Sequence, residues 1–235
     1  MSQLWTQLAE SAGISLTDEQ TARLHRYLDL LLAANQKMNL TRIDSRRAAE
    51  VGHIADALTL LPLLPREAHR LADIGSGGGV PGIPLAIARP DVTVMLIEST
   101  QKKAAFLKEA AAELGLGNVS VSSWRAEDVG NSNSRETFDV VAARAVGPMD
   151  FLVEWALPLA KKGGKLLAMK GPRIAEELPS AAKAIKLVCG GEAVVHAVAS
   201  LPGITGHVIV EIRKIAKTNA RYPRPATQAK GKPLT

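Results

Sequence analysis

One short stretch, residues 71–82, constrains the fold of this chain more than any other. It reads Leu-Ala-Asp-Ile-Gly-Ser-Gly-Gly-Gly-Val-Pro-Gly, so an apolar run and an acid precede four glycines within five positions. Glycine permits positive φ angles and close approach of the backbone to a ligand, and proline fits the first turn of a helix. The stretch therefore predicts a strand, a tight loop and a helix N-terminus, which together can hold a nucleotide-like ligand.

The segments around this loop alternate between strand and helix patterns. Strands are expected at residues 69–74, 92–97, 119–123, 138–143, 165–170, 192–199 and 206–213, and helices at 81–89, 100–115, 148–160 and 173–188. Such alternation predicts an α/β fold with a mostly parallel, doubly wound sheet. The last two expected strands are joined by a short link without a helix, which predicts a closing antiparallel hairpin.

The part of the chain before residue 66 has a helical pattern instead. Three amphipathic helices are expected there, and His53 and Asp56 would share one face of the third, because they are three residues apart. We therefore expect three parts: a helical extension packed on the core at residues 1–65, the core at 66–214 and a basic tail at 215–235.

The charge of the chain is concentrated at its C-terminal end. Residues 1–212 hold 22 Lys and Arg against 23 Asp and Glu, whereas residues 213–235 hold seven basic side chains and no acid. A nearly neutral globule with a basic tail suggests a polyanionic partner such as a nucleic acid. The alternative is a solvated, disordered tail that keeps the protein soluble.

The composition argues against several other classes of protein. The single cysteine, Cys189, excludes an internal disulfide and a cysteine zinc site, and no metal site is expected. No apolar run approaches the ~18 residues of a membrane-spanning helix, and the start lacks a signal-peptide pattern. We therefore expect a cytoplasmic protein without membrane association.

Two ligand classes compete for the glycine loop. Residues 77–82 match the dinucleotide fingerprint Gly-x-Gly-x-x-Gly, and residues 73–79 match Asp-x-Gly-x-Gly-x-Gly, a pattern typical of S-adenosylmethionine-dependent methyltransferases. Both classes need an acid after the second strand for a ribose diol, and Glu98 stands there. The glycines begin directly after Asp73, a hairpin closes the sheet, and no second nucleotide-binding half follows. These features favour a methyltransferase over an NAD-dependent oxidoreductase.

Two further segments follow the next strands. In Trp124–Asp128, an apolar residue beside an acid can flank an adenine ring, with Glu127 or Asp128 near its amine, although an ordinary polar loop is the alternative. Arg144 follows the fourth strand at the carboxyl edge of the sheet, where α/β proteins bind ligands. It can hold a carboxylate or a phosphate, or form a plain surface ion pair.

The absence of two motifs narrows the range of possible methyl acceptors. Enzymes that methylate exocyclic amines of bases commonly carry an Asn/Asp-Pro-Pro-aromatic tetrad after the fourth strand, where this chain has Arg-Ala-Val-Gly at residues 144–147. Carbon-5 methylation of pyrimidines needs a cysteine nucleophile, and Cys189 lies far along the chain from the loop. An acceptor with its own lone pair and no proton to lose, such as guanine N7, needs only positioning and no general base.

Residues 73–85 resemble the signature of the bacterial 16S ribosomal RNA guanine-N7 methyltransferases, which are also called the glucose-inhibited division protein B type. Supporting segments follow in the order typical of that family, at residues 38–41, 53–58, 98–103, 144–145, 169–171, 222–224 and 232–234. The resemblance implies a class I methyltransferase fold, S-adenosylmethionine as cofactor, and one guanine of 16S rRNA in the small ribosomal subunit as acceptor.

The resemblance also implies site residues. The cofactor contacts would be Asp73, Gly75, Gly77, Val80, Glu98, Ser99, Thr100, Ala126, Glu127 and Arg144. The RNA contacts would be Asn39, Arg42, His53, Lys170, Arg221 and Arg224. No catalytic acid or base and no obligate protein partner is expected, and the protein is expected to be a monomer. Deletion of residues 217–235 is expected to weaken RNA binding and flatten its salt dependence, and to spare S-adenosylmethionine binding. A methyltransferase of another RNA, of a protein or of a small molecule, and a non-enzymatic RNA-binding module, remain alternatives.

Overall fold

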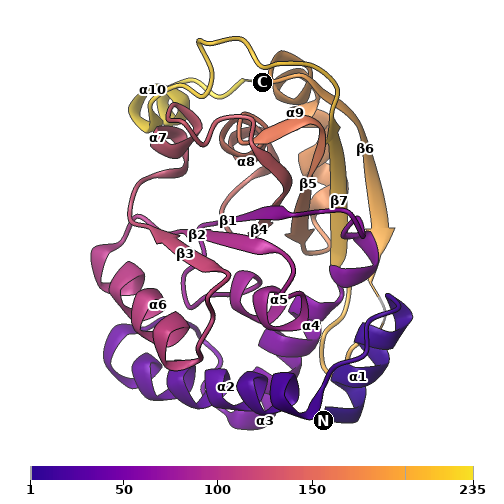
Figure 1. Ribbon diagram of the computed structural model, residues 1–235. Helices are drawn as coiled ribbons and strands as arrows, with labels where there is room; N and C mark the ends of the chain where they lie inside the picture. The colour runs from indigo at the N-terminus through magenta and orange to yellow at the C-terminus, as the bar shows by residue number, and fades with distance from the viewer. Residues whose placement is uncertain (1, 199, 235) are drawn as a thin grey trace.

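The computed structural model describes residues 2–198 and 200–234, which form a seven-stranded sheet (Figure 1). The strands are β1 (Arg70–Ile74), β2 (Thr93–Ile97), β3 (Val119–Ser122), β4 (Phe138–Arg144), β5 (Ala160–Lys170), β6 (Gly190–Ala197) and β7 (Val208–Lys214). Their order across the sheet is β3-β2-β1-β4-β5-β7-β6. The strands pair in parallel except β7, which is antiparallel to β5 and to β6, so the expected closing hairpin is confirmed.

Helices cover both faces of the sheet (Figure 1). The N-terminal helices and α5 and α6 lie on one face, and α7, α8 and α9 lie on the other. The helical elements are α1 (Ser2–Ser11), α2 (Asp18–Met38), α3 (Arg46–Ala49), the π-helical segment Glu50–Ala55, α4 (Asp56–Leu58), the 3₁₀ turn Leu61–Leu63, α5 (Gly82–Ala88), α6 (Gln101–Glu113), α7 (Ala126–Gly130), α8 (Met149–Ala156), α9 (Ile174–Leu187) and α10 (Ala226–Gly231). Among the described residues, no helix combines the length and apolarity that a membrane crossing requires.

The alternation of side chains along β1 explains why the sheet needs two layers of helices. Leu71 joins the apolar cluster that includes the N-terminal helices, whereas Ala72 and Ile74 join the cluster on the α8 side. Side chains on both faces of the central strands are thus buried, as is usual for a parallel sheet. The ends of the parallel strands at one edge stay free to form a site.

The N-terminal helices pack directly against the glycine loop. The Tyr27 hydroxyl donates a hydrogen bond of 2.8 Å to the Gly78 carbonyl. A Cβ at Gly78 would stand 2.6 Å from Leu31 Cδ1, so a side chain there would collide with α2. Helix α2 therefore fixes the outer side of the loop, and the loop requires glycine at position 78 for close packing.

Several elements differ from the sequence-based expectation. The third expected N-terminal helix is divided into α3, the π-helical segment and α4, and the strand expected at 192–199 spans Gly190–Ala197, with residue 199 outside the described residues. Helices α7 and α10 were not expected, because five or six residues show too little periodicity to reveal a helix. Strand β5 begins at Ala160 rather than at residue 165, and its register with β4 shifts between Phe138 and Val140. An ion pair of Lys161 with Asp139 lies beside this irregularity.

Candidate functional site

The site begins at Asp73, at the end of β1. Its side chain is fully buried, and Oδ2 accepts a hydrogen bond of 3.1 Å from the N–H of Gly82, the first residue of α5. The other oxygen, Oδ1, has no hydrogen-bond partner among residues 2–198 and 200–234. Gly75 then turns the loop with φ of +66°, and a Cβ there would be 3.0 Å from Val146 Cγ2. The loop is thus held between α5 below it and the segment after β4.

Glu98, which follows β2, ties the loop to the next helix. One carboxylate oxygen accepts from the Gly77 N–H at 3.0 Å and the other from the Thr100 N–H at 2.7 Å. The side chain is only 7% exposed, yet it also lines a cavity. Because each carboxylate oxygen has two acceptor positions, Glu98 can still accept hydrogen bonds from a ligand diol.

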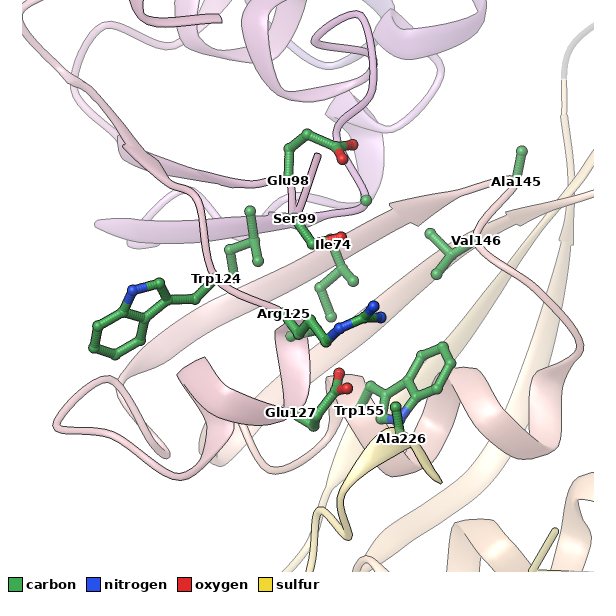
Figure 2. A pocket seen from close by; sticks show the side chains of 13 residues that line it. Ile74, Glu98, Ser99, Trp124, Arg125, Glu127, Ala145, Val146, Trp155 and Ala226 are labelled. Atoms are coloured by element: carbon green, nitrogen blue, oxygen red, sulfur yellow. The ribbon is translucent and has the colours of Figure 1, made fainter. Parts of the chain in front are cut away.

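A first cavity of about 260 Å³ opens beside Glu98 (Figure 2). Two buried polar atoms on its wall residues, Glu127 Oε1 and Trp155 Nε1, have no hydrogen-bond partner in the part of the chain that the structure describes. Figure 2 shows the two side chains close to each other, below Arg125. A buried acceptor and a buried donor without partners suit a flat ligand edge that carries both an amine and a ring nitrogen, as adenine does.

A second cavity of about 400 Å³ adjoins the first, and Gly75 and Ala145 line both. Its wall comes from the glycine loop, from residues 40–43 after α2, and from His53. Three basic side chains line it, namely Arg42, Lys103 and Arg144. No described residue on this wall carries a carboxylate, so the second cavity favours an anionic ligand.

Arg144, at the end of β4, is fixed by contacts with the π-helical segment Glu50–Ala55 and with α4. Its guanidinium donates to the Gly52 carbonyl at 2.7 Å and lies 3.1 Å from the Asp56 carboxylate, which is 1% exposed. A third guanidinium nitrogen lies 3.3 Å from His53 Nδ1. The other Asp56 oxygen lies 3.1 Å from His207 Nδ1. The π-helical segment thus brings His53 to the sheet edge, and the start of α4 brings Asp56 there.

His53 is neutral at physiological pH. Burial and the neighbouring positive charge of Arg144 lower its pKa to about 4, although the Gly52 carbonyl acts in the opposite direction. A guanidinium can only donate, so Nδ1 accepts and Nε2 carries the proton. His53 is therefore a weak base that contributes no charge to the second cavity.

The structure divides the expected cofactor residues between the two cavities. Glu98, Ser99, Ala126 and Glu127 line the first cavity, Gly77, Val80 and Arg144 line the second, and Gly75 lines both. Asp73 lies beneath the loop, and Thr100 contributes its N–H to Glu98. The first cavity is also lined by residues that were not among the expected cofactor contacts, namely Ile74, Ile97, Trp124, Arg125, Ala145, Val146, Trp155 and Ala226. Of these, Trp124 and Arg125 lie in the segment Trp124–Asp128 that the sequence had singled out.

The expected RNA contacts are scattered. Arg42 and His53 line the second cavity, and Asn39, in the left-handed conformation, ends α2 just before it. Lys170 is 2.6 Å from Glu177 and donates to the Gly147 carbonyl, so its charge is already paired. The remaining two belong to the C-terminal segment, where Arg224 pairs with Glu154 and Arg221 lies over the Tyr222 ring.

Two other expectations concern cysteine and metals. Cys189 lies between α9 and β6, with Sγ 3.2 Å from the Lys217 carbonyl, and it lines neither cavity. In the described ranges, no group of three or more His, Cys, Asp or Glu residues is arranged to hold a metal ion.

Comparison with known proteins identifies the family. A profile described as rRNA small subunit methyltransferase G matches residues 20–201. This chain belongs to that family. The ribosomal RNA small subunit methyltransferase G of Alkaliphilus oremlandii is 43% identical over 96% of this chain and 95% of the relative. The protein of the same name from Sorangium cellulosum is 46% identical over 90% of this chain and 87% of the relative.

Membership of the rRNA small subunit methyltransferase G family confirms the expected family and enzyme class. Solved structures confirm the class I methyltransferase fold. A predicted O-methyltransferase from Agrobacterium tumefaciens superposes with a TM-score of 0.54 at 19% identity, covering 70% of this chain and 82% of that one. The TYW2 protein of M. jannaschii, in complex with AdoMet, gives 0.53 at 18% identity over 74% and 80% of the two chains.

The residues of the first cavity fit the cofactor of this enzyme family, S-adenosylmethionine. Glu98 presents a carboxylate where a ribose diol needs an acceptor, and the unpartnered atoms of Glu127 and Trp155 match an adenine edge. The fit rests on polar atoms that are buried without partners, which native structures rarely tolerate unless a ligand or water satisfies them.

Asp73 makes stability depend on pH. Its burial raises the pKa to about 7, against the opposing effects of the Gly82 N–H, the Ser76 hydroxyl and the Arg144 charge. The folded state thus binds a proton that the unfolded state has released above pH ~4, so the free energy of unfolding falls as pH rises towards 7. In the wild type, the free energy of unfolding should fall by up to about 1.4 kcal/mol per pH unit in this range, and we expect Asp73→Asn to remove this pH dependence. Urea titrations of both proteins from pH 4.5 to 8 measure this slope, and parallel curves would contradict the assignment.

Proposed function

We propose that this protein transfers the methyl group of S-adenosylmethionine to N7 of a guanine in 16S rRNA, in the bacterial cytoplasm and as a monomer. The observation that carries the proposal is the pair of adjoining cavities. The first fits the cofactor, the second is basic, and they meet at Gly75 and Ala145. A methyl group held at this junction faces a base held in the second cavity.

The second cavity suits an acceptor that has no proton to lose. Guanine N7 carries a lone pair in the plane of the ring, so a general base is not required. No carboxylate lies on the described wall, and the low pKa of His53 makes it a poor proton acceptor. The bound cofactor supplies an electrophilic methyl group. The chain's own residues position the two ligands and exclude water, and correct positioning alone can supply much of the rate enhancement.

The charges around the second cavity favour RNA over a small neutral acceptor. Arg42 is exposed at the wall and carries no ion pair in the described structure, and Lys103, in the first turn of α6, also lines the cavity. Phosphate contacts of this kind position a nucleic acid, while the cavity itself selects the base. The charge of Arg144 is balanced by Asp56, so it adds little repulsion against the cationic product.

The proposal predicts which atom is modified. Small ribosomal subunits that lack this methylation should accept tritiated methyl from S-adenosylmethionine at one guanine, which nuclease mapping locates. The same RNA with 7-deazaguanosine at that position, in which a C–H replaces N7, should accept no label. It should still compete with unmodified RNA for binding, which controls for its folding. Label that persists on the 7-deaza RNA would show another acceptor atom, and label on protein or on small molecules would contradict an RNA substrate.

A further inference from the structure

The C-terminal segment, residues 218–234, is folded back over α7 and α8 instead of extending into solvent (Figure 1). The Tyr222 side chain is 5% exposed and packs in the apolar cluster of the α8 side. Ala229 in α10 is fully buried, and Leu234 packs against the same cluster. We call residues 218–234 the C-terminal strap. Its apolar side chains supply core contacts that a solvated tail would lack.

Polar contacts fix the strap at several points along α7 and the loop that follows. Arg135 donates to the carbonyls of Thr218, Asn219 and Tyr222 at 2.9, 3.2 and 2.7 Å. Asn131 donates to the Pro223 carbonyl at 3.1 Å. These contacts satisfy backbone carbonyls of the strap, so they hold its path independently of any charged ligand.

The strongest contact joins the strap to α8. Arg224 makes a bidentate pair with Glu154, from Nε to Oε1 at 2.7 Å and from Nη2 to Oε2 at 2.7 Å, and its backbone N–H donates to Oε1 at 3.0 Å. Glu154 is 1% exposed, so this is a buried pair. Paired bonds of this kind fix both partners in orientation as well as in distance. A phosphate would have to compete with a buried carboxylate for this guanidinium.

The strap reaches the cofactor cavity two residues beyond Arg224. Ala226, the first residue of α10, lines that cavity together with Glu127 and Trp155 (Figure 2). Trp155 follows Glu154 directly on α8, so the residue that anchors the strap is adjacent to a residue of the cavity wall. Strap and α8 therefore form one continuous wall at the end of the cavity that fits adenine.

We propose that the C-terminal strap is a fixed wall of the cofactor cavity and that Arg224 is its positioning residue, which holds Ala226 and Trp155 in place through Glu154. This inference rests on the proposed function, which identifies S-adenosylmethionine as the ligand of the cavity. It revises the expectation that loss of the tail spares cofactor binding, because loss of the strap opens the cavity and exposes Tyr222 and the core.

Calorimetric titration with S-adenosylhomocysteine tests the strap by direct binding. Arg224→Ala is expected to weaken binding at least about tenfold, because a loosened wall must be ordered again by the ligand. Arg221→Ala is the matched control. Arg221 lies three residues before Arg224 and carries the same charge on an exposed side chain. Its guanidinium carbon lies 4.9 Å from the centroid of the Tyr222 ring. Arg221→Ala should bind within twofold of the wild type.

A second pair of variants covers the case in which Arg224→Ala, which strands the Glu154 charge, fails to fold. Ala226→Trp places bulk directly in the cavity and should also weaken S-adenosylhomocysteine binding about tenfold or more. Thr227→Trp, at the exposed neighbouring position, should not. In steady-state assays, the KM for S-adenosylmethionine should rise in the folded wall variants while kcat and the KM for RNA change little.

The outcomes separate the inference from the function on which it rests. If the wild type binds S-adenosylhomocysteine, and both Ala226→Trp and folded Arg224→Ala bind it within twofold, the strap is no part of the cavity and the inference is wrong. If the two arginine variants lose RNA affinity equally and keep full cofactor affinity, the tail acts only through its charge, which also overturns the inference. If the wild type binds neither S-adenosylhomocysteine nor S-adenosylmethionine, the proposed function fails instead.

Discussion

Replacing Glu98 with alanine is expected to weaken binding of S-adenosylhomocysteine about 100-fold, or roughly 3 kcal/mol. The variant removes the acceptor for a ligand diol, and each hydrogen bond to a charged group contributes about 1.5–3 kcal/mol. It also leaves the N–H groups of Gly77 and Thr100 without the carboxylate that now holds them. Loop and ligand thus lose the same anchor, and isothermal titration calorimetry measures the combined effect.

Two controls distinguish the specific position of the Glu98 carboxylate from the general effect of removing one negative charge. Asp128→Ala removes an exposed carboxylate in the first turn of α7 that does not line the cavity, and it should leave the affinity unchanged. Glu98→Asp keeps the charge but shortens the side chain by one methylene. Its affinity for S-adenosylhomocysteine should therefore lie between those of the wild type and Glu98→Ala. Equal affinity of Glu98→Ala and the wild type would exclude Glu98 from the ligand site.

Replacing Arg144 with methionine is expected to abolish methyl transfer and to lower stability by about 3–5 kcal/mol, the usual cost of removing one partner of a buried ion pair. The variant removes the arginine partner of the Asp56 carboxylate, which is 1% exposed and keeps only its contact with His207. For a chain of this size, each kcal/mol corresponds to roughly 2–4 °C in melting temperature. Circular dichroism should therefore record a decrease of about 10 °C or more.

A double variant tests whether this loss arises from the stranded charge. Arg144→Met with Asp56→Asn removes both charges, so it should regain most of the lost melting temperature without regaining activity. The recovery would show that the pair fixes α4 to the sheet edge, and the missing activity would show that Arg144 also serves the site. A single variant that melts within 2 °C of the wild type would contradict the role of the pair.

Local patterns in the sequence predicted the glycine loop, Glu98 and the closing hairpin, because each depends on residues within one or two neighbouring elements. The carboxyl ends of parallel strands share an edge, so the loop and Glu98 could be placed together before the structure was known. Arg42 and His53 reach the second cavity only through the packing of helices, which no local pattern specifies.

The C-terminal strap shows most clearly where sequence reasoning ends. Counting charges identified Arg224 as a cation, but its partner Glu154 lies 70 residues earlier in the chain and is buried on α8. Trp155 and Ala226 likewise line one cavity from α8 and α10, which are far apart in the sequence. No periodicity or spacing links such residues, because tertiary packing alone brings them together.

The central claim is that a cofactor cavity and a base cavity meet at Gly75 and Ala145. A crystal structure of the complex with S-adenosylhomocysteine tests it most directly. We expect the adenine beside Glu127 and Trp155, the ribose hydroxyls on Glu98, and the sulfur at the junction, facing the second cavity. Adenine bound in the second cavity, or a sulfur that faces away from the junction, would contradict it.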